Sequence, residues 1–309
     1  MPFFHRDPDL TDQGTSILEQ TWHAFPSLAP DQIAVTWLVY DEPVIVNTGG
    51  ALTPEDFWRH PLRGFSYRGN ERIYPASVVK LFYLVALAEW LAKGMVEPHP
   101  ELERAMADMI VGSSNDAASL VVDTLTGTTS GPVLPAGPFA TWQSQRNLVN
   151  RYFQSLGWEE LPPINVNQKT WSDGPYGRER VFVGELYENR NMLTTDACAR
   201  LLHSIVGGVA VSPEACRRMM ALLERNLSPE VPAPGEENQV TGFLGAGLDP
   251  DAKLWSKAGW MSRVRHDCAY IEPPQGRPYL LTVFTEGTAN AANPEILPFI
   301  SRAFADAQP

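Results

Sequence analysis

The sequence is poor in cysteine and lacks the spacing patterns that bind metal ions. Its 309 residues include three cysteines, which cannot all pair, and none stands in a Cys-x-x-Cys or Cys/His array. We therefore expect neither a disulfide framework nor a metal site, and we predict a reducing compartment. A chain of this length buries one or two cores without such cross-links. The three cysteines are Cys198, Cys216 and Cys268.

Segments that direct export or cross a membrane are also missing from the sequence. Residues 1–8 lack the basic start and the unbroken apolar stretch of a signal peptide. The most apolar run, Leu81–Ala92, is too short for a bilayer and contains Glu89. We expect a cytoplasmic protein without a membrane span, unless a segment outside this sequence directs export.

Positive charge is scarce as well. The chain has 24 Lys and Arg against 36 Asp and Glu, which gives a formal net charge of -12. Such a chain repels a phosphate backbone on average, so nucleic acid is not an expected partner. Hydrophobic residues make up 44% and charged residues 19%, an ordinary globular composition.

The apolar and β-branched runs predict the order of secondary-structure elements. Residues 32–41 and 43–47 predict two strands of a hairpin. The nearly all-apolar run Ser77–Ala92, between Pro75 and Gly94, predicts a helix that is buried on most sides. Further helices are predicted at 101–110, 116–125, 143–156, 195–206, 212–226 and 294–306, and late strands at 254–256, 268–272 and 279–285.

This order predicts an α/β (α+β) fold, with an antiparallel sheet covered by helices and an inserted all-α subdomain. We expect one domain over residues 1–309. Its α/β subdomain comprises residues 25–75 and 207–309, and its helical subdomain residues 76–206. Residues 161–191 hold several Pro, Gly and Asn without a clean period, which predicts a long irregular loop of the kind that often carries function.

A hydroxyl and an amine, on Ser77 and Lys80, stand three residues apart at the start of the buried helix. Residues at this spacing share one helix face, so the two groups can meet. A serine hydroxyl needs a neighbouring base, and a lysine can serve when desolvation or other cations lower its pKa. The helix N-terminus also offers N–H groups to a developing oxyanion. Because Ser-x-x-Lys is a common pattern, its context decides its meaning.

Two other short segments supply polar groups. Ser113–Asn115 falls on a turn before a predicted helix, where Ser and Asn also serve as helix caps. Lys257–Gly259 falls at the end of a predicted late strand, where a lysine followed by a turn is common at a sheet edge. Each segment alone favours these structural roles.

Together, the three segments resemble the motifs of serine β-lactamases and penicillin-binding proteins, which are Ser-x-x-Lys, Ser-Asp-Asn and Lys-Thr-Gly. They occur in that order as Ser77–Lys80, Ser113–Asn115 and Lys257–Gly259. Residues 65–72 resemble the strand that enters the first motif in class A enzymes, and residues 267–271 resemble the strand after the third. The resemblance covers nearly the whole chain.

The resemblance implies a role for each motif residue. Ser77 attacks a carbonyl and forms an acyl-enzyme, with Lys80 as base or proton relay. Ser113 passes a proton to the leaving nitrogen, and Asn115 holds the substrate amide. Lys257 orients Ser113 and attracts a substrate carboxylate.

Two further positions are implied to bind substrate. The backbone N–H groups of Ser77 and Trp260 form the oxyanion hole. Arg265 stands where such enzymes often keep a carboxylate-binding arginine, whose guanidinium suits that task by its bidentate fork. A solvated surface arginine is the alternative for Arg265.

The sequence departs from the family pattern in the second and third motifs. Ser114 replaces the aspartate of the second motif, and Ala258 replaces the threonine of the third. The lost threonine hydroxyl usually helps to hold a β-lactam carboxylate.

The long loop gives no unambiguous match to the glutamate that deacylates class A enzymes. Glu185 is the best candidate, because Glu185 and Asn189 repeat a glutamate and an asparagine four apart that would position a water. Glu179 and Glu188 are the alternatives, and a solvated loop carboxylate is the structural alternative for each.

We therefore predict a serine hydrolase that acts through Ser77, without a cofactor, on a β-lactam, a peptide or another amide or ester that bears a carboxylate. A D-alanyl peptidase or esterase with Lys80 as sole base is one alternative. A glutaminase shares the fold, but Lys257–Gly259 points away from it. The changes at Ser114 and Ala258 support a third alternative, a β-lactamase-like protein that binds a ligand without turnover.

Overall fold

Seven strands form one sheet in the computed structural model, which describes residues 2–40, 52–171, 173–228 and 237–307. The strand order across the sheet is β1-β3-β2-β7-β6-β5-β4, and every neighbouring pair is antiparallel except β1 and β3, which are parallel. The strands are β1 (Phe4–Arg6), β2 (Ile33–Val39), β3 (Leu62–Tyr67), β4 (Glu224–Arg225), β5 (Lys253–Met261), β6 (Val264–Glu272) and β7 (Tyr279–Glu286).

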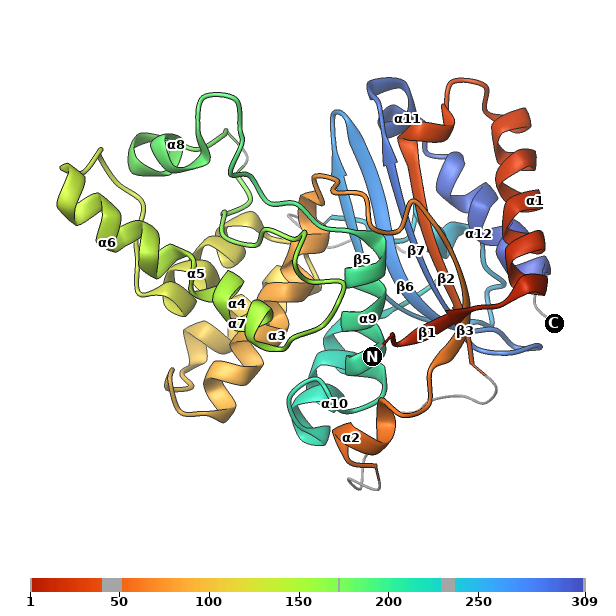
Figure 1. Cartoon of the computed structure of the whole chain (residues 1–309), viewed down its shortest axis with the longest axis horizontal. Coiled ribbons are helices and arrows are strands. Elements are labelled where there is room, and N and C mark those ends of the chain that lie inside the picture. The colour runs from red at the N-terminus through yellow and green to blue at the C-terminus, as the bar shows by residue number, and fades with distance from the viewer. Residues whose placement is uncertain (1, 41–51, 172, 229–236, 308–309) are drawn as a thin grey trace.

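Helices cover both faces of this sheet and extend to one side of it. The α-helices are α1 (Pro8–Ala24), α2 (Pro54–Phe57), α3 (Lys80–Ala92), α4 (Pro100–Ile110), α5 (Asn115–Thr126), α6 (Ala136–Arg146), α7 (Leu148–Ser155), α8 (Gly177–Val183), α9 (Thr195–Val206), α10 (Pro213–Leu223), α11 (Thr288–Ala292) and α12 (Ile296–Asp306). Short 3-10 turns are η1 (Pro30–Gln32), η2 (Ala76–Val79) and η3 (Leu244–Gly247). Helices α1 and α12 cover one face and α9 lies on the other, with α4 to α8 beyond α3 (Figure 1). The predicted α/β class, with a sheet covered by helices, is confirmed.

The sheet extends further than the sequence predicted. The first expected strand corresponds to β2, whose residues are all buried and which lies between β3 and β7. The second, residues 43–47, lies outside the described residues. The late strands β5, β6 and β7 are present, and β5 and β6 begin or end several residues beyond the predicted limits. The parallel strand β1 makes the sheet mixed instead of wholly antiparallel.

The helices differ from the sequence prediction in several places. The helix expected at 143–156 is divided into α6 and α7 at Asn147, whose side chain donates to the Gln143 carbonyl and accepts from Asn150. An asparagine that bonds to nearby backbone competes with the helical hydrogen bonds. The unpredicted helix α1 carries a recognisable start, because Asp7 caps the N–H of Leu10 and proline follows it.

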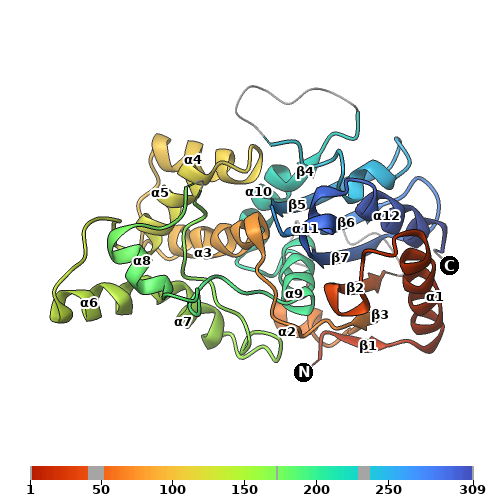
Figure 2. The same ribbon diagram turned by 90° about the horizontal axis from the view of Figure 1, so that it is seen from above.

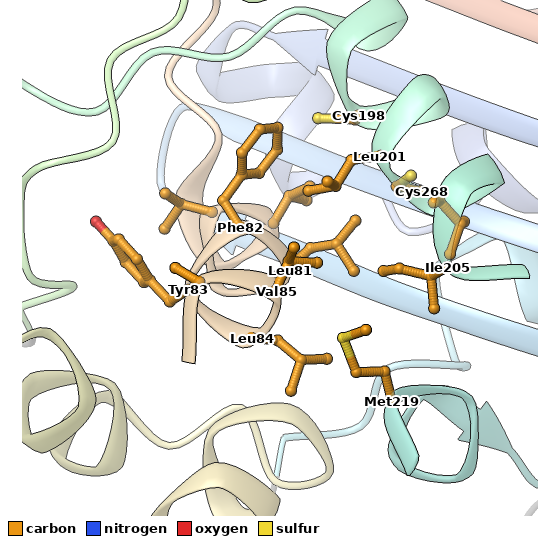
Figure 3. Close-up of a cluster of buried hydrophobic side chains, with 14 of the residues drawn as sticks. Leu81, Phe82, Tyr83, Leu84, Val85, Cys198, Leu201, Ile205, Met219 and Cys268 are labelled. Atoms are coloured by element: carbon orange, nitrogen blue, oxygen red, sulfur yellow. The ribbon is translucent and has the colours of Figure 1, made fainter. Parts of the chain in front are cut away.

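Helix α3 is the central element of the larger apolar core, as its sequence predicted. Side chains from α3, α9, α10 and β6 meet in one cluster (Figure 3), and seen from above α3 lies between the sheet and α4 to α8 (Figure 2). The hydroxyl of Tyr83 points away from this cluster and donates to the Gln168 carbonyl at 2.5 Å, which ties α3 to the long loop. The helix is therefore held on all sides, and its first turn has a fixed position beside β5.

Candidate active site

Ser77 lies on a constrained turn that leads into α3. Ala76, directly before it, has a φ of 45°, a left-handed conformation that is uncommon for a residue with a side chain. Strained backbone of this kind clusters at functional sites, where the surrounding structure holds it in place. Ser77 itself is buried, with an exposed fraction of 8%.

The strand β5 is packed directly against this turn. A Cβ built on Gly259 would lie 2.7 Å from the carbonyl oxygen of Pro75 and 3.0 Å from the amide nitrogen of Ser77. No side chain fits in that space, so glycine is required at this position of the third motif. The amide nitrogen of Ser77 therefore lies close to the backbone of β5.

The carbonyl of Tyr74, three residues before Ser77, is fixed by a buried histidine of β6. The N–H of Thr285 donates to Nδ1 of His266 at 3.1 Å, so the ring proton stands on Nε2, which donates to the Tyr74 oxygen at 2.9 Å. Burial lowers the pKa of His266 to about 4, which keeps the ring neutral and this tautomer in place.

Lys80 is the fully buried amine of the first motif. Its Nζ lies 3.0 Å from Ser77 Oγ, 2.9 Å from Asn115 Oδ1 and 3.2 Å from Ser113 Oγ, and it also contacts the Ser113 carbonyl. The amide and carbonyl oxygens can only accept, so they take two hydrogens of the amine. A neutral amine then has its lone pair left for a hydroxyl proton. This arrangement suits a base for Ser77.

The surroundings of Lys80 lower its pKa, so that a neutral amine is available to act as a base near neutral pH. Burial lowers the pKa of Lys80 to about 7, against a smaller opposing effect of the Glu237 carboxylate. Removing a charged ammonium from water disfavours it, and here no carboxylate forms an ion pair with it among the described residues. A lysine that acts as the base for Ser77 needs such a shift, and desolvation produces it.

The three motifs meet at Ser113. Its φ is 55°, again left-handed, and its Oγ lies 3.2 Å from the Nζ of Lys80 and 3.0 Å from the Nζ of Lys257. Ser114, in place of the family's aspartate, caps α5 by accepting the N–H of Ala117 at 3.2 Å. The second motif thus combines both roles considered for it, a helix cap at Ser114 and a polar group in the cluster at Ser113.

Lys257 is held by a residue that the sequence analysis missed. Its Nζ donates to Ser113 Oγ, to the Ala258 carbonyl at 2.9 Å and to the side-chain oxygen of Gln239. Gln239 is buried, and its amide nitrogen is held by the carbonyls of Ile110 and Val111 at 2.9 and 2.8 Å. Burial, then the positive charge of Lys80, lowers the pKa of Lys257 well below its usual value. No local pattern marks Gln239 in the sequence.

Ala258 contributes to the cluster through its backbone. Its N–H donates to Gln239 Oε1 at 3.3 Å, while its methyl group belongs to the apolar cluster beneath α1 and α12. The side chain at this position therefore faces the opposite side of the sheet from Lys257, as the alternation of a strand requires. Ala258, which replaces the threonine of the family motif, therefore occupies a position in the apolar core.

Trp260 and Arg265 form a cross-strand pair at the end of β5. Trp260 is exposed to 55%, and its indole N–H donates to the Ala291 carbonyl at 2.9 Å. Arg265 is half-buried, stacks on Phe243 and Trp260, and donates to the carbonyls of Ala291 and Gly242 at 3.0 and 3.2 Å. Arg265 is thus anchored to backbone and aromatic rings instead of being a freely solvated side chain.

The structure does not bring the glutamate candidates of the loop to this cluster. Glu185 is exposed, and Asn189 is engaged by the amide groups of Asn165 and Asn167. Glu188 is exposed too, and it accepts the N–H of Leu186 at 2.9 Å. In the described ranges, neither carboxylate is hydrogen-bonded to the first motif.

Glu179 is buried in a separate ionic network. Its Oε1 accepts from Arg146 at 2.6 Å and from Ser130 at 2.9 Å, while Arg146 and Lys169 also reach Asp123. Desolvation raises the pKa of Glu179, and the Arg146 charge opposes this shift. These contacts fasten α8 to α5 and α6.

Substitution of Gly259 tests the close approach of β5 to the turn that carries Ser77. We expect Gly259→Ala to slow acylation by about a hundredfold, the cost of misplacing reacting groups by about 1 Å. Gly137→Ala is the control, because a Cβ at Gly137 of α6 meets nothing within 4 Å. Stopped-flow acylation rates check this. A Gly259→Ala rate equal to that of the parent would show that the turn tolerates a side chain.

Solved structures share this architecture over nearly the whole chain. A mutant of PBP-A, described as an acyl-enzyme complex with penicillin-G, is 18% identical with a TM-score of 0.65, and the match covers 99% of this chain and 98% of that one. A β-lactamase from Sphaerobacter thermophilus is 19% identical with a TM-score of 0.61 over 95% and 97%. One from Xanthomonas campestris is 18% identical with a TM-score of 0.61 over 95% and 98%. The fold is therefore the β-lactamase fold.

The chain belongs to the β-lactamase enzyme family, whose model matches residues 96–307, well over half of the sequence. Ser77 and Lys80 precede that range, so their assignment rests on the geometry described above. No curated protein matches the chain by sequence. Within the described ranges, none of the helices has the length and apolar character needed to cross a membrane.

Proposed function

We propose that this protein is a serine hydrolase that cleaves an amide or ester bond through an acyl-enzyme on Ser77. The observation that carries the proposal is the buried contact of 3.0 Å between Lys80 Nζ and Ser77 Oγ, beside two further motifs that meet at Ser113. Family membership supports a reaction of this class. The binding-only alternative would not require a lysine whose pKa is lowered to about 7.

The proposed acylation follows from the atoms in contact. The neutral amine of Lys80 accepts the Ser77 proton as Oγ bonds to the carbonyl carbon, and charge develops on the carbonyl oxygen. The N–H groups of Ser77 and Trp260 stabilise that charge. Ser113, held by Lys257, gives its proton to the leaving atom as the bond breaks, and the Lys80 ammonium at 3.2 Å reprotonates Ser113. The products are an ester on Ser77 and a released amine or alcohol.

Hydrolysis of this ester needs a second base step. Lys80, neutral again after its proton has passed to Ser113, can accept a proton from a water that attacks the ester. A loop glutamate is the other candidate, with Glu185 first by sequence. The lack of a bonded carboxylate at Ser77 and Lys80 among the described residues favours Lys80 as sole base, the arrangement of the peptidase or esterase alternative.

The substrate class follows from charge. Arg265 places a guanidinium near β5 in a chain of net charge -12, which favours a substrate with a carboxylate near the scissile bond. The Lys257 amine is buried and already donates to three acceptors, so Arg265 is the residue more open to solvent. We propose a small carboxylate-bearing amide or ester.

Intact-mass spectrometry after incubation with penicillin G, a cephalosporin and p-nitrophenyl esters tests the proposed function. We expect the mass of the chain to rise by that of one acyl group, at a peptide that contains Ser77. Absence of any adduct across the whole panel would refute the acyl-enzyme and favour a binding protein without turnover.

The same adducts test the deacylating base. We expect Glu185→Gln, Glu179→Gln and Glu188→Gln each to deacylate within about threefold of the parent, because general-base assistance is worth about a hundredfold or more and no such loss is expected. The decay of the adduct mass with time measures this rate. A stable adduct in one variant alone would identify that glutamate as the base and restore the class A mechanism.

A further inference from the structure

A hollow of about 140 Å³ lies beside the turn that carries Ser77, since Tyr74 of that turn lines it. Met261 of β5 and Trp171, Tyr187 and Arg190 of the long loop line it as well. Water occupies roughly 30 Å³ per molecule in the liquid, so this space accepts a chain of about four or five heavy atoms. The hollow is not occupied by any side chain of the described residues.

The hollow lies where the acyl half of a substrate extends. Ser113 and Lys257 mark the leaving-group side of Ser77, at the earlier part of β5. The acyl group therefore projects the other way along β5, past Trp260 to Met261. Tyr74, whose carbonyl is fixed by His266, forms the wall nearest to the nucleophile.

Arg190 is the cation of this hollow that has no carboxylate partner among the described residues. Its guanidinium carbon lies 3.4 Å from the ring centroid of Tyr74 and 5.5 Å from that of Tyr187. Its Nε is buried without a hydrogen-bond partner, and no described carboxylate pairs with it. Lys169 also lines the hollow but is committed to Asp123 at 2.6 Å. The rings of Tyr74 and Tyr187 hold the Arg190 guanidinium in the lining of the hollow.

The Arg190 guanidinium favours an anionic ligand in this hollow. A carboxylate suits it, because its two oxygens match the planar fork of guanidinium donors.

We propose that this hollow binds the acyl group of the substrate and that Arg190 selects acyl groups ending in a carboxylate. The inference rests on the proposed acyl-enzyme at Ser77. It assigns the substrate a second carboxylate, on the acyl side, besides the one expected near Arg265 on the leaving-group side.

Two matched esters test the proposal. Mono-p-nitrophenyl adipate has an acyl chain that ends in a carboxylate, and p-nitrophenyl adipamate is its neutral amide counterpart. Burst release of p-nitrophenol gives the acylation rate of each, with the rate of Ser77→Ala subtracted as background. We expect the parent to favour the adipate by about tenfold, the low end for a charge-assisted hydrogen bond. Arg190→Gln abolishes this preference, and Arg190→Lys restores part of it.

Arg180→Gln is the matched control. Arg180 also stacks on Tyr187, at 4.7 Å, but it donates to the carbonyls of Gly184 and Glu185 and does not line the hollow. This variant keeps the preference. Equal rates for the two esters in the parent, or an unchanged ratio in Arg190→Gln, overturn the proposal while the acyl-enzyme stands. No p-nitrophenol release above the Ser77→Ala background with either ester overturns both.

Discussion

Ser77→Ala is expected to take up no adduct from any acyl compound and to lose turnover by roughly a million-fold, the order seen when the nucleophile of a serine hydrolase is removed. The reason is that no other hydroxyl of the described residues has the same two neighbours. Ser77 Oγ lies beside the Lys80 amine on a turn packed against β5, whereas Ser113 Oγ lies between the lysines of the first and third motifs. Intact mass and p-nitrophenol release measure the two losses.

Ser114→Ala is the control for this variant. It removes the hydroxyl that caps α5, which costs about 1 kcal/mol of stability, and it leaves the cluster in place. We expect its melting temperature to fall and its adduct to form at the rate of the parent. A Ser77→Ala protein that still gains the mass of one acyl group would end the assignment of the nucleophile.

Acylation by the parent is expected to rise with pH and to level off above about pH 7. Burial lowers the pKa of Lys80 to about 7, so the amine is protonated below that pH and has no lone pair for the Ser77 proton. The rate should then fall about tenfold for each pH unit below 7. Stopped-flow acylation with p-nitrophenyl esters, corrected for their own hydrolysis, gives the profile.

Lys80→Met is expected to slow acylation by about a hundred- to ten-thousand-fold and to abolish this pH dependence, because the hydroxyl then keeps its proton. Lys93→Met is the matched control at the end of the same helix, since Lys93 is 63% exposed and pairs with Glu89 at 2.6 Å. It should retain both rate and profile. A rate in Lys80→Met equal to that of the parent, or a parent profile without a step near pH 7, would exclude Lys80 as the base.

The sequence by itself predicted the elements whose signals are local. The apolar run after Ser77 specified a buried helix, because a helix without a polar face has to be covered on all sides. The spacing of Ser77 and Lys80 placed hydroxyl and amine on one face, and the structure has them 3.0 Å apart. Helix α1 was missed although its cap at Asp7 is local too.

In the long loop, residues 161–191, local sequence patterns did not predict the contacts that the structure shows. The spacing of Glu185 and Asn189 suggested a pair that positions a water, but Asn189 is drawn into a network of amides with Asn165 and Asn167 and Glu185 is exposed. A segment without a repeating hydrophobic pattern gives no indication of which side chains point inward. Contacts made with the rest of the protein decide that.

What the sequence alone determined is therefore the fold class, the order of the three motifs and the pairing of Ser77 with Lys80, since each follows from short local patterns and from their order along the chain. Tertiary structure decided the rest. Gln239 reaches Lys257 only after the chain has folded, and Gly259 is required only because β5 meets the turn before Ser77. The pKa of Lys80 belongs to the folded state as well, because removal of water from the ammonium lowers it and no single segment of the chain removes that water.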